Sequence, residues 1–196
     1  MVESVKNNGF LVSVMGEIEK AYIQDIDNIY VKYCFVYGKD WDVTSGIEEG
    51  ITQISKHTSG CPQFVWNFPI EIVFKSNNPH GWPQLILCVY GLDGFGNDVI
   101  RGYGLCHLPI SSGSATKQVR LFVPQSSSSV QKFTSWLTGH RPEYIDPKIL
   151  TVGDGREVTR TRSEGIVFVK FNILTKDFFT HGFDNNARVK RINVDV

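Results

Sequence analysis

The pair Cys106–His107 is the first place in this sequence where catalysis is conceivable. A thiol beside an imidazole is the combination that cysteine nucleophiles share with a general base. The two residues follow the glycine-rich stretch 77–104, NNPHGWPQLILCVYGLDGFGNDVIRGYG, and belong to VIRGYGLCHLPI, which has the composition of a strand. Neighbouring residues of a strand point to opposite faces of a sheet. The thiol and the imidazole are therefore predicted to point apart, and we expect no catalysis by this pair.

The other candidate residues for catalysis or zinc binding lack the required spacing. His80 lies in the expected loop NPHGWP, and no G-x-S-x-G elbow is present. The remaining histidines are far apart in the chain: His57, His140 and His181. Zinc ligands on a helix or a turn come at short, regular spacings. The sequence thus predicts no catalytic residues and no zinc site.

The glycines of the same stretch do not form a phosphate-binding loop. Such loops follow patterns like G-x-G-x-x-G or G-x-x-x-x-G-K-[ST] and open a helix. Neither pattern occurs, and Gly94 and Gly96 lead into the strand-like NDVIRGYG. We interpret these glycines as turn residues between two paired strands. Gly102 and Gly104 are expected to mark a bulge or a close backbone approach.

Aspartates suggest a calcium site, because Ca²⁺ takes six to eight oxygen ligands. The candidates fall in three predicted loops: Asp25 and Asp27, Asp40 and Asp42, and Asp93 and Asp98. The alternative is that short Asp-x-Asp pairs are solvated turn residues that hydrogen-bond their own backbone. The sequence offers too few ligands for calcium, so we predict no metal and no cofactor.

The last candidate for a binding site is a row of arginines, which we call the basic ridge. In GREVTRTRSEG, an extended chain places Arg160 and Arg162 on one face, and Arg156 lies close by. One reading is a contact with anionic lipid headgroups or an acidic protein. The other is a solvated edge strand guarded by charges, since Glu157 and Glu164 are interspersed.

Composition narrows the class of protein. The 196 residues carry a formal net charge of zero, with 41% hydrophobic and 20% charged residues. A chain with no net charge lacks the excess of lysine and arginine that nucleic-acid-binding proteins typically carry. Four widely spaced cysteines indicate reduced thiols in a cytosolic protein. The start MVESVKNNGF has no signal-peptide pattern, and no apolar run reaches membrane-spanning length, so we expect neither export nor a membrane span.

Alternation with a period of two predicts the elements that position these residues. In WNFPIEIVF the aromatic and aliphatic residues alternate with mostly polar ones, and Pro69 is expected at an edge or a bulge. The same alternation occurs in segments near residues 10–18, 31–37, 119–123 and 167–173. In contrast, QLILCVY (84–90) is apolar throughout, which is typical of a strand buried on both faces. Seven to nine strands in one domain predict an all-β fold, a single antiparallel β-sandwich with few short helices.

The predicted domain spans residues 10–177. Residues 1–9 form an N-terminal lead, and residues 178–196 are expected to be a poorly ordered polar and basic tail. The best helical candidate is SSVQKFTSWLTG, residues 128–139, which follows the serine-rich loop PQSSSS.

Several long motifs closely resemble the B9 domain family. They include YVKYCFVYGKDWDVTSGIEEGITQIS, the turn NPHGWP, FGNDVIRGYG and GDGREVTRTRSEGIVFVKFNILTKD, and the resemblance covers residues 10–177. It implies a C2-like β-sandwich without enzymatic activity. It also implies partners, namely other B9 domain proteins and the tectonic-like complex, at the transition zone and basal body on the cytoplasmic side of the cilium. There the protein would help build the diffusion barrier needed for ciliogenesis and Hedgehog signalling, with no nucleic acid and no small-molecule substrate.

An adaptor of this kind would act through its surfaces. Aromatic side chains are frequent anchors of protein interfaces, and we nominate Trp82, Phe95 and Tyr103, in and beside the glycine-rich loops. The opposing reading is that these rings pack inside the sandwich. A second function, peripheral binding to anionic phospholipid, would use Arg156, Arg160 and Arg162.

Overall fold

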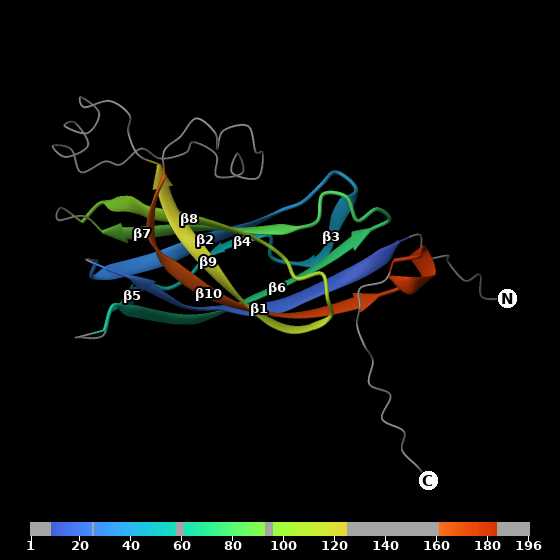
Figure 1. Ribbon diagram of the computed structural model, residues 1–196, viewed down its shortest axis with the longest axis horizontal. Coiled ribbons are helices and arrows are strands. Elements are labelled where there is room, and N and C mark those ends of the chain that lie inside the picture. The colour runs from blue at the N-terminus through green and yellow to red at the C-terminus, as the bar shows by residue number, and fades with distance from the viewer. Residues whose placement is uncertain (1–8, 25, 58–60, 93–95, 125–160, 184–196) are drawn as a thin grey trace, which may run out of the picture.

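The computed structural model describes residues 9–24, 26–57, 61–92, 96–124 and 161–183 (Figure 1). The strands are β1 (Phe10–Ile23), β2 (Asn28–Val36), β3 (Trp41–Gly46), β4 (Glu49–Ile51), β5 (Ser55–Lys56), β6 (Gln63–Ser76), β7 (Gln84–Leu92), β8 (Asp98–His107), β9 (Gly113–Pro124) and β10 (Thr161–Lys176). A short 3₁₀ helix, η3 (Phe179–His181), follows β10. Where seven to nine strands are predicted, ten occur within the described residues, because β4 and β5 are too short to show a period of two.

All these strands belong to one antiparallel sheet. Its order is β3-β6-β1-β10-β9-β8-β7-β2-β4, with β5 paired to β2. The sheet curls so that the β6-β1-β10 half faces the β8-β7-β2 half, as the ribbon shows (Figure 1). The two faces enclose one core, which confirms the predicted all-β antiparallel sandwich.

The two edges of the sheet are linked by the chain itself. β3 and β4 stand at opposite ends of the strand order, but only Ile47 and Glu48 separate them in sequence. At one end of this junction Ile47 N donates to Glu71 O at 3.2 Å. At the other end Gln53 Nε2 donates to Trp66 O at 2.8 Å, and Val65 N donates to Ser55 Oγ at 3.2 Å. Segment 47–55 therefore lies between β2 and β6 and closes the curled sheet; we call this junction the seam.

The inner faces follow the alternation in the sequence. The buried residues come from β1, β2, β6, β9 and β10: Phe10, Val12, Val14, Ile18, Val31, Tyr33, Phe35, Ile70, Ile72, Phe74, Val119, Leu121, Val167, Val169, Phe171 and Ile173. β6 breaks its register with β1 near Asn67, which has a φ of +46°. Pro69 lies just past this bulge and beyond the residues paired with β3, which confirms its predicted place.

β7 is buried on both faces, as its continuous apolar run predicts. Leu85, Leu87 and Val89 belong to the inner core. Ile86 and Cys88 belong to a second buried cluster that includes Ile100 and Tyr103 of β8.

The two glycines of β8 serve a close approach and a bulge. The pairing of β7 with β8 slips by one residue between Val89 and Tyr90, which places a bulge beside Gly102. A Cβ at Gly104 would lie 2.7 Å from Val119 Cγ1 on β9. Any side chain there would push β8 away from β9, so both predicted roles of the glycines are confirmed.

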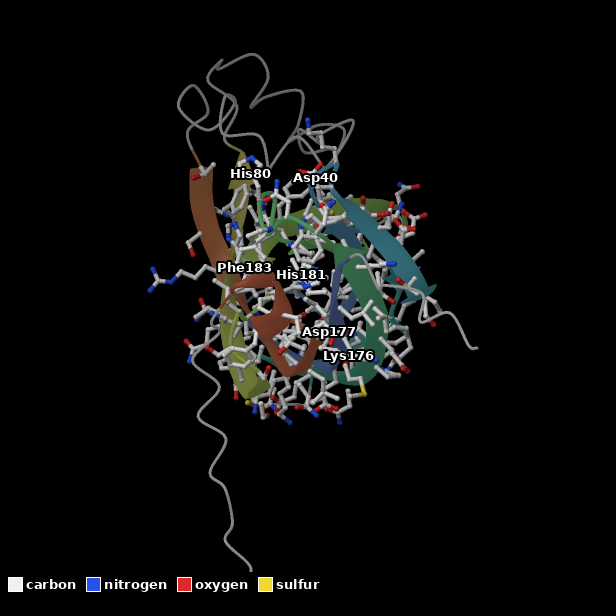
Figure 2. All side chains as sticks on the ribbon, turned by 90° about the vertical axis from the view of Figure 1, so that its right-hand side faces the viewer. Asp40, His80, Lys176, Asp177, His181 and Phe183 are labelled. Carbon is white, nitrogen blue, oxygen red and sulfur yellow. The ribbon has the colours of Figure 1, made fainter. Side chains whose placement is uncertain are left out.

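The end of the sandwich nearest the C-terminus is capped by aromatic rings. Phe178 is only 5% exposed, and its ring lies 4.5 Å from that of Phe10 and 6.2 Å from that of Trp82. In Figure 2 the turn that carries Asp177, His181 and Phe183 lies across this end of the sheet. The packed part of the domain thus continues six residues past the predicted boundary at 177, through Phe183.

Candidate interaction surfaces

Trp82, the first nominated anchor, is half-buried and structural. It lies in the turn before β7, where its Nε1 donates to Leu108 O at 3.0 Å. Its ring meets the ring of Trp41 edge to face at 5.1 Å. The indole therefore joins the turn before β7 to the segment after β8, and only part of it is accessible to a partner.

Tyr103, the second nominated anchor, is fully buried. It belongs to the second cluster, on the face of β8 turned away from the inner core, and its ring lies 6.3 Å from that of Phe122. A side chain without exposed surface cannot anchor a partner, so the structure corrects this expectation and favours the opposing reading. Phe95 lies outside the described residues.

Of the basic ridge, only Arg162 lies within the described residues; Arg156 and Arg160 do not. Arg162 is exposed at the start of β10. Its Nε donates to Glu164 Oε1 at 3.1 Å, and its Nη2 forms an ion pair with the same carboxylate. The pairing offsets the charge that a lipid headgroup would need to meet.

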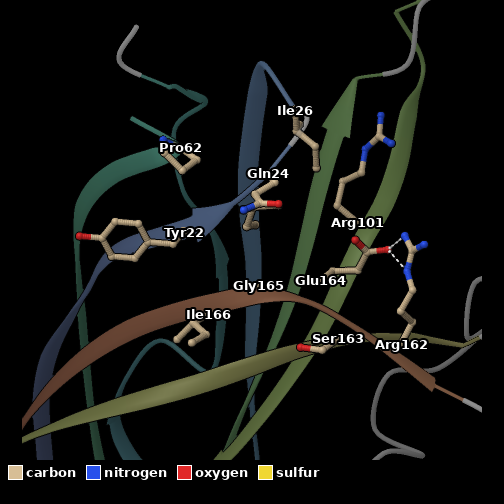
Figure 3. Close-up of a pocket in the computed structure, with 11 residues that line it drawn as sticks. Tyr22, Gln24, Ile26, Pro62, Arg101, Arg162, Ser163, Glu164, Gly165 and Ile166 are labelled. Atoms are coloured by element: carbon tan, nitrogen blue, oxygen red, sulfur yellow. Dashed lines mark hydrogen bonds and ion pairs between the residues drawn. The ribbon is translucent and has the colours of Figure 1, made fainter. Parts of the chain in front are cut away.

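A cleft of about 630 Å³ lies beside this ion pair, where the end of β1 meets the start of β10 (Figure 3). Tyr22, Gln24 and Pro62 line one side, and Arg101 reaches it from β8. Arg101 Nη2 donates to Leu92 O at 2.8 Å, so this guanidinium is tied to the backbone of β7. Both arginines of the cleft are thus engaged by the protein.

The described aspartates that the sequence nominates for calcium form no metal-ligand cluster. Asp27 precedes β2 and lies 3.4 Å from His57 Nε2, whereas Asp40 Oδ2 accepts from Asn78 Nδ2 at 2.9 Å near the other end of the sandwich. Asp25 and Asp93 lie outside the described residues. Within the described part of the chain, no three His, Cys, Asp or Glu side chains are grouped as metal ligands would be.

The Cys106–His107 pair behaves as its strand position predicts. Cys106 packs against the inner core, while His107 is exposed. Burial raises the pKa of the Cys106 thiol to about 12, an effect only partly opposed by the charge of Lys117. A thiol with this pKa carries almost no thiolate at neutral pH and is a poor nucleophile.

One exposed apolar surface among the described residues was missed by the sequence reasoning. It lies along the seam and contains Ile47, Ile51 and Ile54, with exposed fractions of 64%, 56% and 56%, and the neighbouring Val65 and Pro69 of β6. We call these five residues the seam surface. The isoleucines follow a spacing of four and three, so a search for alternation with period two passes over them.

Comparison with known proteins places the chain in a family. A sequence profile of the B9-C2 family, described as "Ciliary basal body-associated, B9 protein", matches residues 12–174. The B9 domain-containing protein 1 of Xenopus laevis is 55% identical over 91% of this chain and 90% of its own length. The human protein of that name is 54% identical over 89% of this chain and 86% of its own length.

More distant relatives extend the comparison. The B9 domain-containing protein 2 of Bos taurus is 29% identical over 88% of this chain and 98% of its own length. Among solved structures, a C2 domain of plant extended synaptotagmin 1 aligns over 86% of this chain and 95% of its own, with a TM-score of 0.40 and 13% identity. No helix within the described residues is long and apolar enough to span a bilayer. The profile covers most of the chain, and this protein belongs to the B9 domain family, whose members are associated with the ciliary basal body.

Proposed function

We propose that this chain is a non-enzymatic structural component of the ciliary transition zone. In this role it binds sister B9 domain proteins within the tectonic-like complex, on the cytoplasmic side of the ciliary base. The assembly forms a diffusion barrier on which ciliogenesis and Hedgehog signalling depend. The observation that carries the proposal is the near-full-length likeness to B9 domain-containing protein 1 at 54–55% identity.

The geometry supports a role carried by surfaces. The described residues contain a closed apolar core, a half-buried Cys106 thiol with a raised pKa and no cluster of metal-ligand side chains, while the seam surface is exposed. Monomeric proteins rarely expose a contiguous apolar patch of several hundred Å² without a use for it. B9 domain-containing protein 2 aligns with this chain over nearly its whole length, so a related domain of similar size exists as a candidate partner.

Co-purification tests the proposal. The full chain, co-expressed with the B9 domain-containing protein 2 of the same organism, is expected to elute with it as a stoichiometric complex. A tagged copy in ciliated cells is expected at the transition zone, and its removal should let membrane proteins equilibrate between cilium and cell body. A chain that elutes alone, and whose loss leaves the barrier intact, would contradict the proposal.

Phospholipid binding is the second candidate, because Arg101 and Arg162 line one open cleft. An anionic headgroup that entered this cleft would compete with Glu164 for Arg162. Flotation of the full chain with phosphatidylserine vesicles, with and without calcium, separates lipid binding from the adaptor role. Salt-sensitive flotation that is lost in Arg162→Glu supports a lipid module. Equal recovery with neutral and anionic vesicles contradicts it.

A further inference from the structure

The seam surface combines an apolar centre with charges of opposite sign at its two ends. Ile51 lies between Glu49, two residues before it, and Lys56, five residues after it. Glu71, whose carbonyl accepts from Ile47 N, adds a second carboxylate at the Glu49 end. Glu49 and Lys56 pair with Cys34 and Asn28 of β2, which are six residues apart, so at about 3.3 Å per residue the two charges lie roughly 20 Å from each other along the strand.

These charges are unpaired within the part of the chain that the structure describes. Glu49, Lys56 and Glu71 are exposed and form no ion pair with another described residue. Lys32, opposite Ile51 on β2, is likewise exposed and forms no ion pair within that part of the chain. Within the described residues, the Glu49 and Glu71 carboxylates and the Lys56 amine therefore form no ion pair, although Lys32 lies beside the acidic end and Asp27, which lies 3.4 Å from His57 Nε2, lies beside the basic end.

A surface of this kind is complementary to itself. A two-fold axis through its middle turns one copy end for end, so that each acidic end meets the basic end of the other copy. The isoleucines then meet at the centre, where apolar residues are best placed in an interface. Like charges would oppose each other in a parallel arrangement, so the charge order selects the antiparallel one.

We propose that the seam surface is the interface of a two-fold symmetric homodimer, with a second copy of this chain as its occupant. The contact is face to face, because the hydrogen bonds of Ile47 to Glu71 and of Gln53 to Trp66 close the gap that an added strand would enter. An interface centred on five exposed apolar residues falls at the small end, below roughly 1,200 Å² in total, where association is weak and transient. This inference goes beyond the proposed function and does not depend on it.

Sedimentation equilibrium of the full chain between about 10 and 500 µM tests the dimer in a range suited to weak interfaces. The mass is expected to rise with concentration from 22.1 kDa towards twice that value. Ile51→Asp should keep the protein monomeric. Ile110→Asp is the matched control, because Ile110 is 58% exposed but lies in the loop between β8 and β9; it should dimerise like the parent chain.

Charge reversal tests the antiparallel arrangement. E49K leaves Lys56 without its anionic partner, K56E leaves Glu49 without its cationic partner, and each alone should weaken self-association about tenfold or more. An equimolar mixture of E49K and K56E should recover it, because one chain then carries added cations and the other added carboxylates at facing ends. The double variant E49K/K56E should also dimerise. Thermal melts of each variant confirm that it is folded.

Two results would overturn the proposal. One is a parent chain that stays monomeric at every concentration. This result would overturn the dimer even if the seam variants lost binding to a different B9 domain protein. The other is a dimer whose stability is the same in Ile51→Asp as in the parent chain. Failure of the dimer would leave co-purification with a sister B9 domain untouched, so the two proposals fail separately.

Discussion

Phe178 is predicted to hold the C-terminal cap on the sandwich. Complete truncation of a core phenylalanine to alanine costs about 3–5 kcal/mol. Phe178 is 5% exposed and packs on Phe10 and Trp82, but it lies at one end of the core, where neighbours relax more easily. We therefore expect Phe178→Ala to lower the free energy of unfolding by about 3 kcal/mol. For a chain of this size that corresponds to a fall in Tm of about 6–12 °C.

The adjacent residue provides the control. Phe179 is 67% exposed, so Phe179→Ala should change stability by less than about 0.5 kcal/mol. Urea denaturation followed by tryptophan fluorescence measures both variants, and Trp82 lies close enough to Phe178 to report on the cap. A chain ending at residue 177 should lose at least as much stability as Phe178→Ala. Equal stability of the two alanine variants would refute the reasoning and restore the boundary predicted from sequence.

Two further predictions concern the core. Gly104→Ala should destabilise the protein by about 1–3 kcal/mol in chemical denaturation, because the added methyl overlaps Val119; a neutral effect would mean that β8 and β9 separate freely. In labelling with a maleimide at pH 8, the exposed Cys61 should react first, while Cys106, with a pKa of about 12, has a thiolate fraction on the order of 10⁻⁴. Labelling of Cys106 should rise only as the pH approaches 12 or when the protein unfolds, and rapid labelling at pH 8 in the folded state would contradict its burial.

The sandwich is predictable because burial imposes a period of two on its strands. Residues such as Val12 and Val14 in β1, or Val167 and Val169 in β10, alternate with outward side chains and lie on the inner face, as predicted. The same logic separates Cys106 from His107. The lack of a backbone N–H in proline likewise predicts Pro69 at an edge or a bulge, and Pro69 lies just past a bulge. In each case a local pattern determines the result, and distant parts of the chain do not alter it.

The packing of Phe178 in the C-terminal cap and the burial of Tyr103 depend on contacts between distant parts of the chain. Alternation within one strand could not predict either of them. Phe178 follows the last alternating strand and looks like the start of a polar tail, yet it packs on Phe10, at the other end of the described chain. Tyr103 points away from the inner core, and alternation alone would leave it on the surface. It is buried because side chains of both β7 and β8 pack together on the outer face of the sheet, and the sequence of one strand alone does not show this packing.

The seam surface illustrates how an exposed apolar surface can escape a search for strands. Segment 47–55 serves two edges at once, so its residues pair with β2 at Glu49–Ile51 and reach β6 through Gln53 and Ser55. Such a segment has no single inner face, and its isoleucines do not alternate. A sequence that needed only to close the sheet would place polar residues at positions as exposed as Ile47 and Ile51, because charged and polar side chains blunt edges at less risk of aggregation. Isoleucines at these exposed positions, between carboxylates and lysines, break the pattern that sheet closure alone would produce, and the proposed dimer would account for them.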